Sequence, residues 1–149
     1  MKARDVMTTY PSVVLPDETT IEAARIMRDR NVNVLPVVGD LRNRALVGIL
    51  TDRDLVVRCM AAGHDGACLV REHMTTAPLI WVGPDADVRE VAAKMAGHTF
   101  RRIPVLDHGR RLVGVVALAD LDVKARATHP VLVEDVERYI YPPPEAFAR

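Results

Sequence analysis

Residues 46–55 read LVGILTDRDL, and residues 112–121 read LVGVVALADL. Each stretch begins with an apolar run that contains a glycine and ends on Asp-Leu. Apolar and β-branched residues favour a strand, and an acidic residue in the next turn favours the start of a helix. The same strand-to-helix signature therefore occurs twice, which indicates an internal repeat.

Three more segments recur in the same order on the N-terminal side of this signature. VMTT at 6–9 returns as HMTT at 73–76, PDETTIEAARIM at 16–27 as PDADVREVAAKM at 84–95, and LPVV at 35–38 as IPVL at 103–106. The offset between equivalent residues changes only from 67 to 68 to 66. Such small changes belong in loops, so the chain contains one structural unit twice.

Each repeat predicts the order strand, helix, strand, strand, helix, from β-type apolar runs and from apolar residues at helical spacing. The expected strands are 12–15, 34–38 and 45–50, then 79–82, 102–106 and 112–116; the expected helices are 20–30 and 52–61, then 88–97 and 119–127. One unit of about 60 residues is marginally stable alone. We therefore expect an α/β (α+β) fold in which the two repeats pack as a pseudo-two-fold pair.

The expected domain organisation is one motif over residues 1–63, a second over 64–128, and a C-terminal tail over 129–149. Val133, Val136 and Ile140 give the tail the spacing of a short amphipathic helix. We expect this helix to pack on the module or to join a dimer contact.

Composition excludes several classes of function. The 149 residues contain 20 Lys and Arg against 20 Asp and Glu, so no net charge attracts nucleic acid or an anionic membrane. The first residues lack the apolar run of a secretory signal, and no stretch reaches the roughly 18 apolar residues of a membrane span. Two cysteines form no disulfide framework. These features predict a cytoplasmic protein that contacts neither nucleic acid nor membrane.

The four repeated segments, in this order and twice over, resemble the CBS motif, and two such motifs in tandem resemble a Bateman module. The resemblance covers about residues 2–127. It implies a regulatory module, not an enzyme, that binds AMP, ADP, ATP or S-adenosylmethionine in the cleft between the motifs. It also implies a homodimer that acts on an unidentified protein target. No further domain is evident in the sequence, so we expect a stand-alone module without a cofactor.

The first signature contains Thr51 and Asp54, to which the resemblance assigns phosphate and ribose contacts. A carboxylate accepts two hydrogen bonds from vicinal hydroxyls. The same two residues also fit a helix capping box, with Thr as the N-cap and an acid three residues later. The second signature keeps Asp120 but has Ala117 in place of the threonine, so its phosphate contact is in doubt and the two sites are expected to differ.

The resemblance assigns further ligand contacts by position. Arg102 and Arg101 precede the IPVL strand, where a basic residue reaches phosphate, and a guanidinium suits that contact. Arg53 lies within the first signature and faces either the cleft or solvent. The base is expected to lie in an apolar slot formed by Val13, Pro36, Ile80 and Pro104.

The sequence offers two alternatives to a nucleotide sensor, of which the first is a metal site. Cys59, His64, Cys68 and His73 are metal-ligand types, but their spacing matches no standard zinc pattern, and we expect no metal site there. The second alternative to a nucleotide sensor is a structural or protein-interaction module that acts by dimerisation and binds no nucleotide, and Ala117 slightly favours it.

Overall fold

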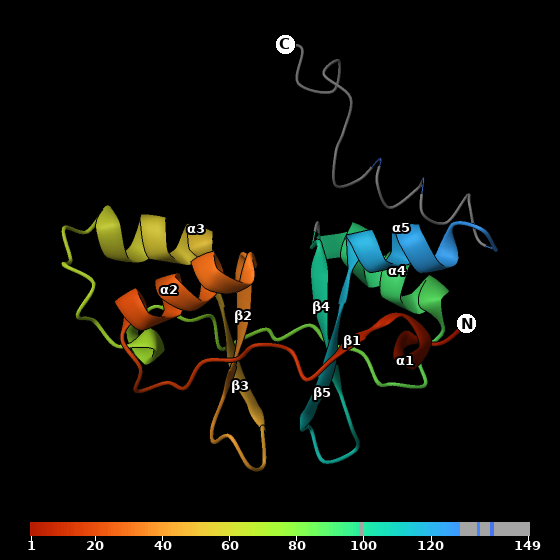
Figure 1. The fold of residues 1–149 in the computed structure, drawn as a ribbon, viewed down its shortest axis with the longest axis horizontal. Coiled ribbons are helices and arrows are strands. Elements are labelled where there is room, and N and C mark those ends of the chain that lie inside the picture. The colour runs from red at the N-terminus through yellow and green to blue at the C-terminus, as the bar shows by residue number, and fades with distance from the viewer. Residues whose placement is uncertain (99, 129–133, 135–137, 139–149) are drawn as a thin grey trace, which may run out of the picture. The chain divides into compact units, whose positions relative to one another are not determined.

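The computed structural model describes residues 1–98, 100–128, 134 and 138. The helix predicted for the tail over 129–149 lies outside these residues, apart from positions 134 and 138. The chain divides into two compact units (Figure 1), one containing Pro11–Leu79 and His108–Leu112, the other Met1–Tyr10, Ile80–Asp107 and the described residues from Val113 onward. We call them the first-hairpin unit and the second-hairpin unit. No helix among the described residues has both the length and the apolar character needed to cross a bilayer.

The first-hairpin unit is built on an antiparallel pair of strands, β2 (Val34–Val38) and β3 (Leu46–Thr51). Helix α2 (Thr20–Arg30) precedes the hairpin, and α3 (Asp52–Asp54) follows it and continues into the π-helical turn η1 (Leu55–Met60). A short 3₁₀ helix, η2 (Val70–Glu72), lies near the end of the unit. Sequence chemistry explains the bounds of α2, because Thr19 and Glu22 form a capping box and Asn31 ends the helix in the left-handed region.

The second-hairpin unit repeats this arrangement with one additional strand. Strands β4 (Arg102–Leu106) and β5 (Leu112–Ala117) form its hairpin, and β1 (Thr8–Thr9) pairs with β5 in a sheet of order β1-β5-β4. Its helices are α1 (Ala3–Val6), α4 (Val88–His98) and α5 (Leu118–Ala125).

Each unit has its own apolar core, formed by the strand faces and the helices that cover them. The buried cluster of the first-hairpin unit consists of Val14, Ala23, Met27, Leu35, Val37, Leu50 and Val70. That of the second-hairpin unit consists of Ala3, Val6, Val82, Val88, Val91, Ala92, Met95, Ile103, Val105, Val116, Leu118 and Leu121. Aliphatic side chains of moderate size fill both cores, as the low aromatic content of the sequence requires.

The Met-Thr segment of each repeat belongs to the compact unit of the other repeat. Thr75 exchanges two backbone hydrogen bonds with Ile49 of β3, at 2.8 and 2.9 Å, and Thr8 pairs with Val115 of β5 at the equivalent position. The boundary between repeats at residues 63 and 64 therefore differs from the boundaries of the compact units. Each unit needs a segment from outside its own repeat to complete its sheet.

Most of the predicted elements are confirmed, but the prediction of a strand at the start of each repeat is wrong. The runs 12–15 and 79–82 make only single parallel bridges, Val14 with Val37 and Val82 with Val105. Prolines flank both runs, and because a proline has no N–H to donate to a neighbouring strand, it limits the length of a ladder. The helix predicted at 52–61 is present, but it changes from α to π geometry at Leu55.

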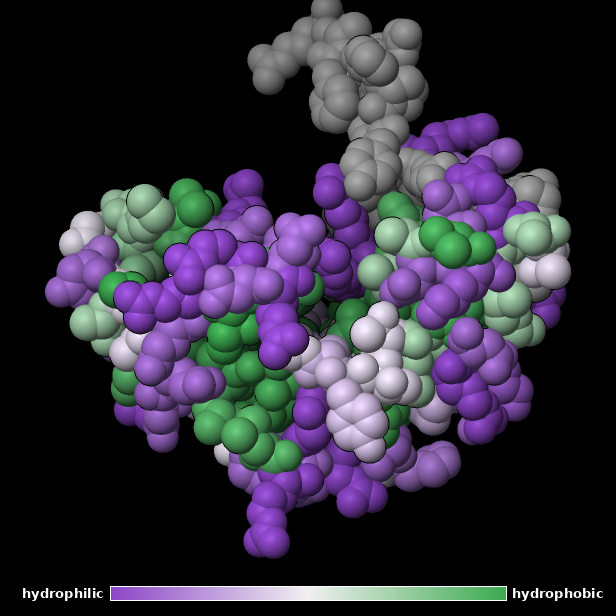
Figure 2. Space-filling view, in the orientation of Figure 1, coloured by the Kyte–Doolittle hydropathy of each residue, from purple (hydrophilic) through white to green (hydrophobic). Residues whose placement is uncertain are grey.

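Hydrophilic residues are interspersed with hydrophobic areas on the face shown in Figure 2, and the α3–η1 helix carries apolar surface. Val56, Val57 and Met60 of η1 are 54%, 51% and 68% exposed. Three exposed large apolar side chains within five residues form a patch that water solvates poorly. We call these three residues the η1 patch.

The close approach of the Met-Thr segment to β3 predicts that Gly48→Ala destabilises the protein. A Cβ at Gly48 would lie 2.7 Å from Met74 Sδ and 3.1 Å from the carbonyl oxygen of Thr75. The methionine side chain can move, but the Ile49 N–H holds that carbonyl at 2.9 Å. Thermal or urea unfolding should show a loss of about 1–3 kcal/mol, which is typical of overpacking.

Gly97→Ala is the matched control, because a Cβ at this helical glycine meets no atom within 4 Å. It should leave stability unchanged or raise it by up to about 1 kcal/mol through helix propensity. Equal unfolding midpoints for the two variants would contradict the role given to Gly48.

Candidate ligand-binding site

Thr51 and Asp54 form a complete capping box at the start of α3. The Thr51 hydroxyl accepts a hydrogen bond from the Asp54 backbone N–H at 3.1 Å, and the Thr51 N–H donates to Asp54 Oδ2 at 2.9 Å. The capping role that the sequence allowed is therefore present in the structure. It holds the Asp54 carboxylate close to the end of β3.

Arg58 is a second partner of Asp54, one that the sequence analysis did not identify. Its guanidinium Nε lies 3.7 Å from Asp54 Oδ1, and its Nη1 donates to the backbone carbonyl of His73 at 3.0 Å. The Asp54 side chain is only 14% exposed. Arg58 thus links this carboxylate to the chain just before the Met-Thr segment. The spacing of four residues between an acid and a cation on a helix is the signal that could have revealed it.

The second repeat retains part of this arrangement. Asp120 Oδ2 accepts the Ala117 N–H at 3.0 Å, so the carboxylate half of the capping box is retained. Ala117 supplies no hydroxyl to cap the Asp120 N–H. Lys124, four residues after Asp120, donates to the carbonyl of Val6 at 2.9 Å, as Arg58 does to His73. The two signatures are therefore alike in their carboxylates and cations and unlike at the threonine position.

The three predicted phosphate-binding arginines differ in their exposure. Arg53 and Arg101 are exposed, and Arg102 is half-buried at the start of β4. The Arg101 carbonyl accepts the Leu118 N–H at 2.8 Å, which joins the start of β4 to the start of α5. Arg102 and Arg101 thus lie in the same unit as Asp120, whereas Arg53 lies in the unit of Asp54.

The four predicted base-contacting residues lie near equivalent backbone hydrogen bonds of the two units, but the bridges at Val14 and Val82 make Trp81, and not Ile80, the counterpart of Val13. Val13 and Ile80 are half-buried, while Pro36 and Pro104 are buried. The Pro36 carbonyl accepts the N–H of Val14 at 3.1 Å, and the Pro104 carbonyl accepts that of Val82 at 3.1 Å. Each proline therefore contributes to the core and also lies beside the segment expected to touch the base.

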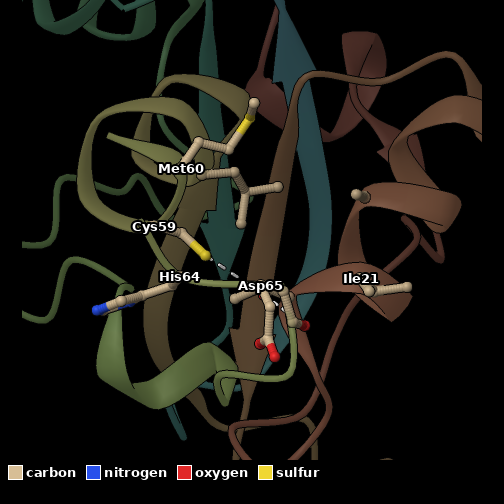
Figure 3. Close-up of a pocket in the computed structure, with 9 residues that line it drawn as sticks. Ile21, Cys59, Met60, His64 and Asp65 are labelled. Carbon is tan, nitrogen blue, oxygen red and sulfur yellow. Dashed lines mark hydrogen bonds between the residues drawn. The ribbon is translucent and has the colours of Figure 1, made fainter. Parts of the chain in front are cut away.

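A separate pocket of about 350 Å³ lies in the first-hairpin unit between α2 and η1 (Figure 3). Its walls are mainly apolar, and the ten residues predicted to bind ligand do not line it. The lining residues are Thr20, Ile21, Ala24, Leu55, Cys59, Met60, His64, Asp65 and Gly66.

Four metal-ligand side chains come together beside this pocket. The ligand atoms of Cys59, His64, Cys68 and His73 all lie within 4.8 Å of one another. Partial burial raises the pKa of the Cys68 thiol above its ordinary value, as do its hydrogen bond with Cys59 and the nearby negative charge. The expectation that no metal binds here depended on spacing along the chain, and that spacing did not reveal the convergence.

Comparison with known proteins accounts for the duplicated unit. The CBS domain family matches residues 3–60 and again residues 70–122. The chain belongs to the CBS-domain family. Its two CBS motifs are the two repeats of the sequence.

The CBS-domain relatives include proteins of similar length. CBS domain-containing protein YhcV of Bacillus subtilis is 42% identical over 120 residues, which cover 80% of this chain and 82% of YhcV. The crystal structure of Hypoxic Response Protein I with two coordinated zinc ions has a TM-score of 0.74 and 36% identity, covering 83% of this chain and 98% of that one. The structure of CBSX2 in complex with AMP has a TM-score of 0.72 and 27% identity, covering 85% of this chain and 96% of that one.

The difference between the two CBS signatures predicts that removing the threonine from the first and introducing one into the second change stability in opposite directions. Thr51→Ala removes the hydroxyl that caps Asp54 N–H, and should lower the free energy of unfolding by about 0.5–2 kcal/mol. Ala117→Thr places the same hydroxyl at the equivalent N-cap, whose backbone angles are close to those of Thr51 (φ −99°, ψ 153° against φ −112°, ψ 160°). It should raise stability by a similar amount.

Urea unfolding followed by circular dichroism measures both changes on the same scale. A destabilising Ala117→Thr would show that the second signature cannot accept a capping hydroxyl, contrary to this prediction.

Proposed function

We propose that this CBS-domain protein is a regulatory module that binds an adenine nucleotide and signals by a change in conformation. The observation that carries the proposal is the Asp54 carboxylate, which the Thr51 N–H and Arg58 hold at the start of α3. The AMP complex of the related CBSX2 supports the choice of ligand class. The relatives also support a regulatory role over a catalytic one.

The chemistry of Asp54 suits a ribose. An ionised carboxylate offers about four lone-pair positions; the capping N–H uses one on Oδ2, and Arg58 forms an ion pair with Oδ1 at 3.7 Å. The remaining positions can accept both hydroxyls of a ribose. The two fixed contacts orient the carboxylate before ligand arrives, which reduces the entropy lost on binding.

The proposed site is asymmetric because Ala117 replaces the threonine of the first signature. We assign phosphate binding to Thr51 and Arg53 in the first-hairpin unit and to Arg102 and Arg101 in the second-hairpin unit, and a weaker second ribose contact to Asp120. Val13 with Pro36 and Ile80 with Pro104 form the two base slots in this proposal. S-adenosylmethionine, which carries the same adenosine group, belongs to the same ligand class.

The proposal predicts saturable binding of at least one member of a panel of AMP, ADP, ATP and S-adenosylmethionine. Ligand that binds only the folded state raises the melting temperature in a concentration-dependent way. Isothermal titration calorimetry and thermal unfolding of the full chain measure both effects. Neither heat nor thermal stabilisation with any of the four would exclude this ligand class.

Asp54→Ala is expected to weaken nucleotide binding at the first site by about tenfold or more, since hydrogen bonds to a charged group contribute about 1.5–3 kcal/mol. Asp52→Ala is the matched control, because Asp52 is an exposed acid in the same helical turn, where it accepts the Arg53 N–H. Asp120→Ala should reduce affinity less than Asp54→Ala. Equal affinities for all three variants would assign the ribose to other residues.

A second function, dimerisation as an interaction module, is favoured by the exposed η1 patch. Burial of about 25 cal/mol per Å² of apolar surface would stabilise a contact between copies. This function and nucleotide sensing are compatible, and a dimer would carry the signal to a protein target.

The free thiols of Cys59 and Cys68 are consistent with the reducing cytoplasm in which we place the protein.

Val57→Glu should shift the full chain from dimer towards monomer, because it puts a charge within the η1 patch. Sedimentation velocity at several concentrations measures the change. Leu41→Glu is the control, since Leu41 is 62% exposed in the turn between β2 and β3, away from the η1 patch. A monomeric parent protein at high concentration would contradict this second function.

A further inference from the structure

We propose that Cys59, His64, Cys68 and His73 bind one Zn²⁺ ion in a closed tetrahedral site within the first-hairpin unit. The four residues supply two sulfur and two nitrogen ligands, and their ligand atoms all lie within 4.8 Å of one another. This site uses none of the residues assigned to the nucleotide.

The distances are close to those that a zinc ion requires. With Zn–S bonds of about 2.3 Å and Zn–N bonds of about 2.0–2.1 Å, tetrahedral coordination places ligand atoms about 3.3–3.8 Å apart. His64 Nδ1 and His73 Nε2 are already 3.4 Å apart, which matches the separation of two nitrogens on one ion. The other ligand atoms, which lie within 4.8 Å of one another, would need to approach by about 1 Å.

Backbone hydrogen bonds hold the segments that carry these ligands. The His64 N–H donates to the Cys59 carbonyl at 3.1 Å, so these two ligands are the ends of one tight turn. The Cys68 carbonyl accepts the Thr20 N–H of α2 at 2.8 Å, and the His73 carbonyl accepts a hydrogen bond from Arg58. The ligand set is therefore largely organised before an ion binds.

Two glycines allow the connecting loop to turn back on itself. Gly63 and Gly66 have φ values of +78° and +86°, a region that other residues rarely adopt. The Gly66 carbonyl accepts the Thr20 hydroxyl at 2.8 Å, and Thr20 also lies 3.7 Å from Cys59 Sγ. The loop is thus attached to α2 beside the thiol, and Figure 3 shows Cys59 and His64 across the pocket from Ile21.

The ligand types and their burial select zinc and a structural role. Thiolate and imidazole ligands favour zinc over magnesium or calcium, which prefer oxygen. Cys59 and His73 are 3% and 5% exposed, and two thiolates balance the charge of Zn²⁺ in this partly buried position. Four protein ligands leave no open position for a substrate, which is typical of a structural site and not a catalytic one. The ion would connect η1 to the segment that leads to the Met-Thr strand.

The test uses the full chain without a histidine tag, purified under reducing conditions and stripped with a chelator. Titration with Zn²⁺ should reach one ion per chain by elemental analysis. Titration with Co²⁺ should give the intense visible bands of a tetrahedral complex and the near-ultraviolet band of thiolate-to-cobalt charge transfer.

Cys68→Ser and His64→Asn test the ligand assignment at the two less buried positions, where folding is least at risk. Each should weaken Zn²⁺ binding by about a hundredfold or more, because even the loss of a supporting partner costs 10–100-fold. Zn²⁺ should raise the melting temperature of the parent chain and leave that of both variants nearly unchanged. His108→Asn, at an exposed histidine outside the cluster, should behave like the parent.

Three results would overturn the proposal. The first is a stripped, reduced chain that takes up neither Zn²⁺ nor Co²⁺. The second is a Co²⁺ spectrum without the thiolate band or unchanged in Cys68→Ser. The third is a chain whose mass, under reductant, is lower by the two thiol hydrogens because Cys59 and Cys68 have formed a disulfide. The apo melting curves of the variants show directly whether a loss of binding reflects unfolding.

Discussion

The close packing of each Met-Thr segment against a glycine-containing strand is the contact on which the rest of the structure depends. Thr75 and Ile49 exchange backbone hydrogen bonds, and Thr8 pairs with Val115 in the same way. A side chain at Gly48 or Gly114 would meet the methionine and the backbone of the paired segment. The two glycines of the repeated signature are therefore required for backbone approach rather than for flexibility.

This contact also makes each compact unit depend on the other repeat. The Met-Thr segment of one repeat completes the sheet of the other, so neither repeat alone contains all the residues of a finished unit. Arg58 and Lys124 strengthen the arrangement by donating to the carbonyls of His73 and Val6, just before those segments. The proposed nucleotide carboxylates lie in the same helical turns as these cations, so ligand contacts and unit assembly involve neighbouring groups.

The pair Thr51 and Asp54 shows how one local pattern serves two purposes. The capping box stabilises the start of α3, and it also fixes the orientation of a carboxylate suited to a ribose. Asp120 retains its backbone hydrogen bond although Ala117 has removed the hydroxyl. An acid at this position is thus useful to the helix even without a ligand, and capping alone accounts for part of its presence in both repeats.

The sequence by itself determined the repeat, the family, the helices α2, α4 and α5 and the four hairpin strands. It also determined, through local chemistry, that Thr51 caps the helix after β3. These features depend on residues a few positions apart, whose spacing reflects helical and strand geometry directly. Only the tertiary structure decided that 12–15 and 79–82 form single bridges, that Arg58 contacts Asp54 and His73, and that Cys59, His64, Cys68 and His73 converge. The metal ligands lie on a helix end, an irregular loop and a 3₁₀ turn, and the path between them depends on positive φ angles at Gly63 and Gly66 and on hydrogen bonds to α2. No regular period relates such positions, so their meeting point is set by how the loop packs and not by their spacing along the chain.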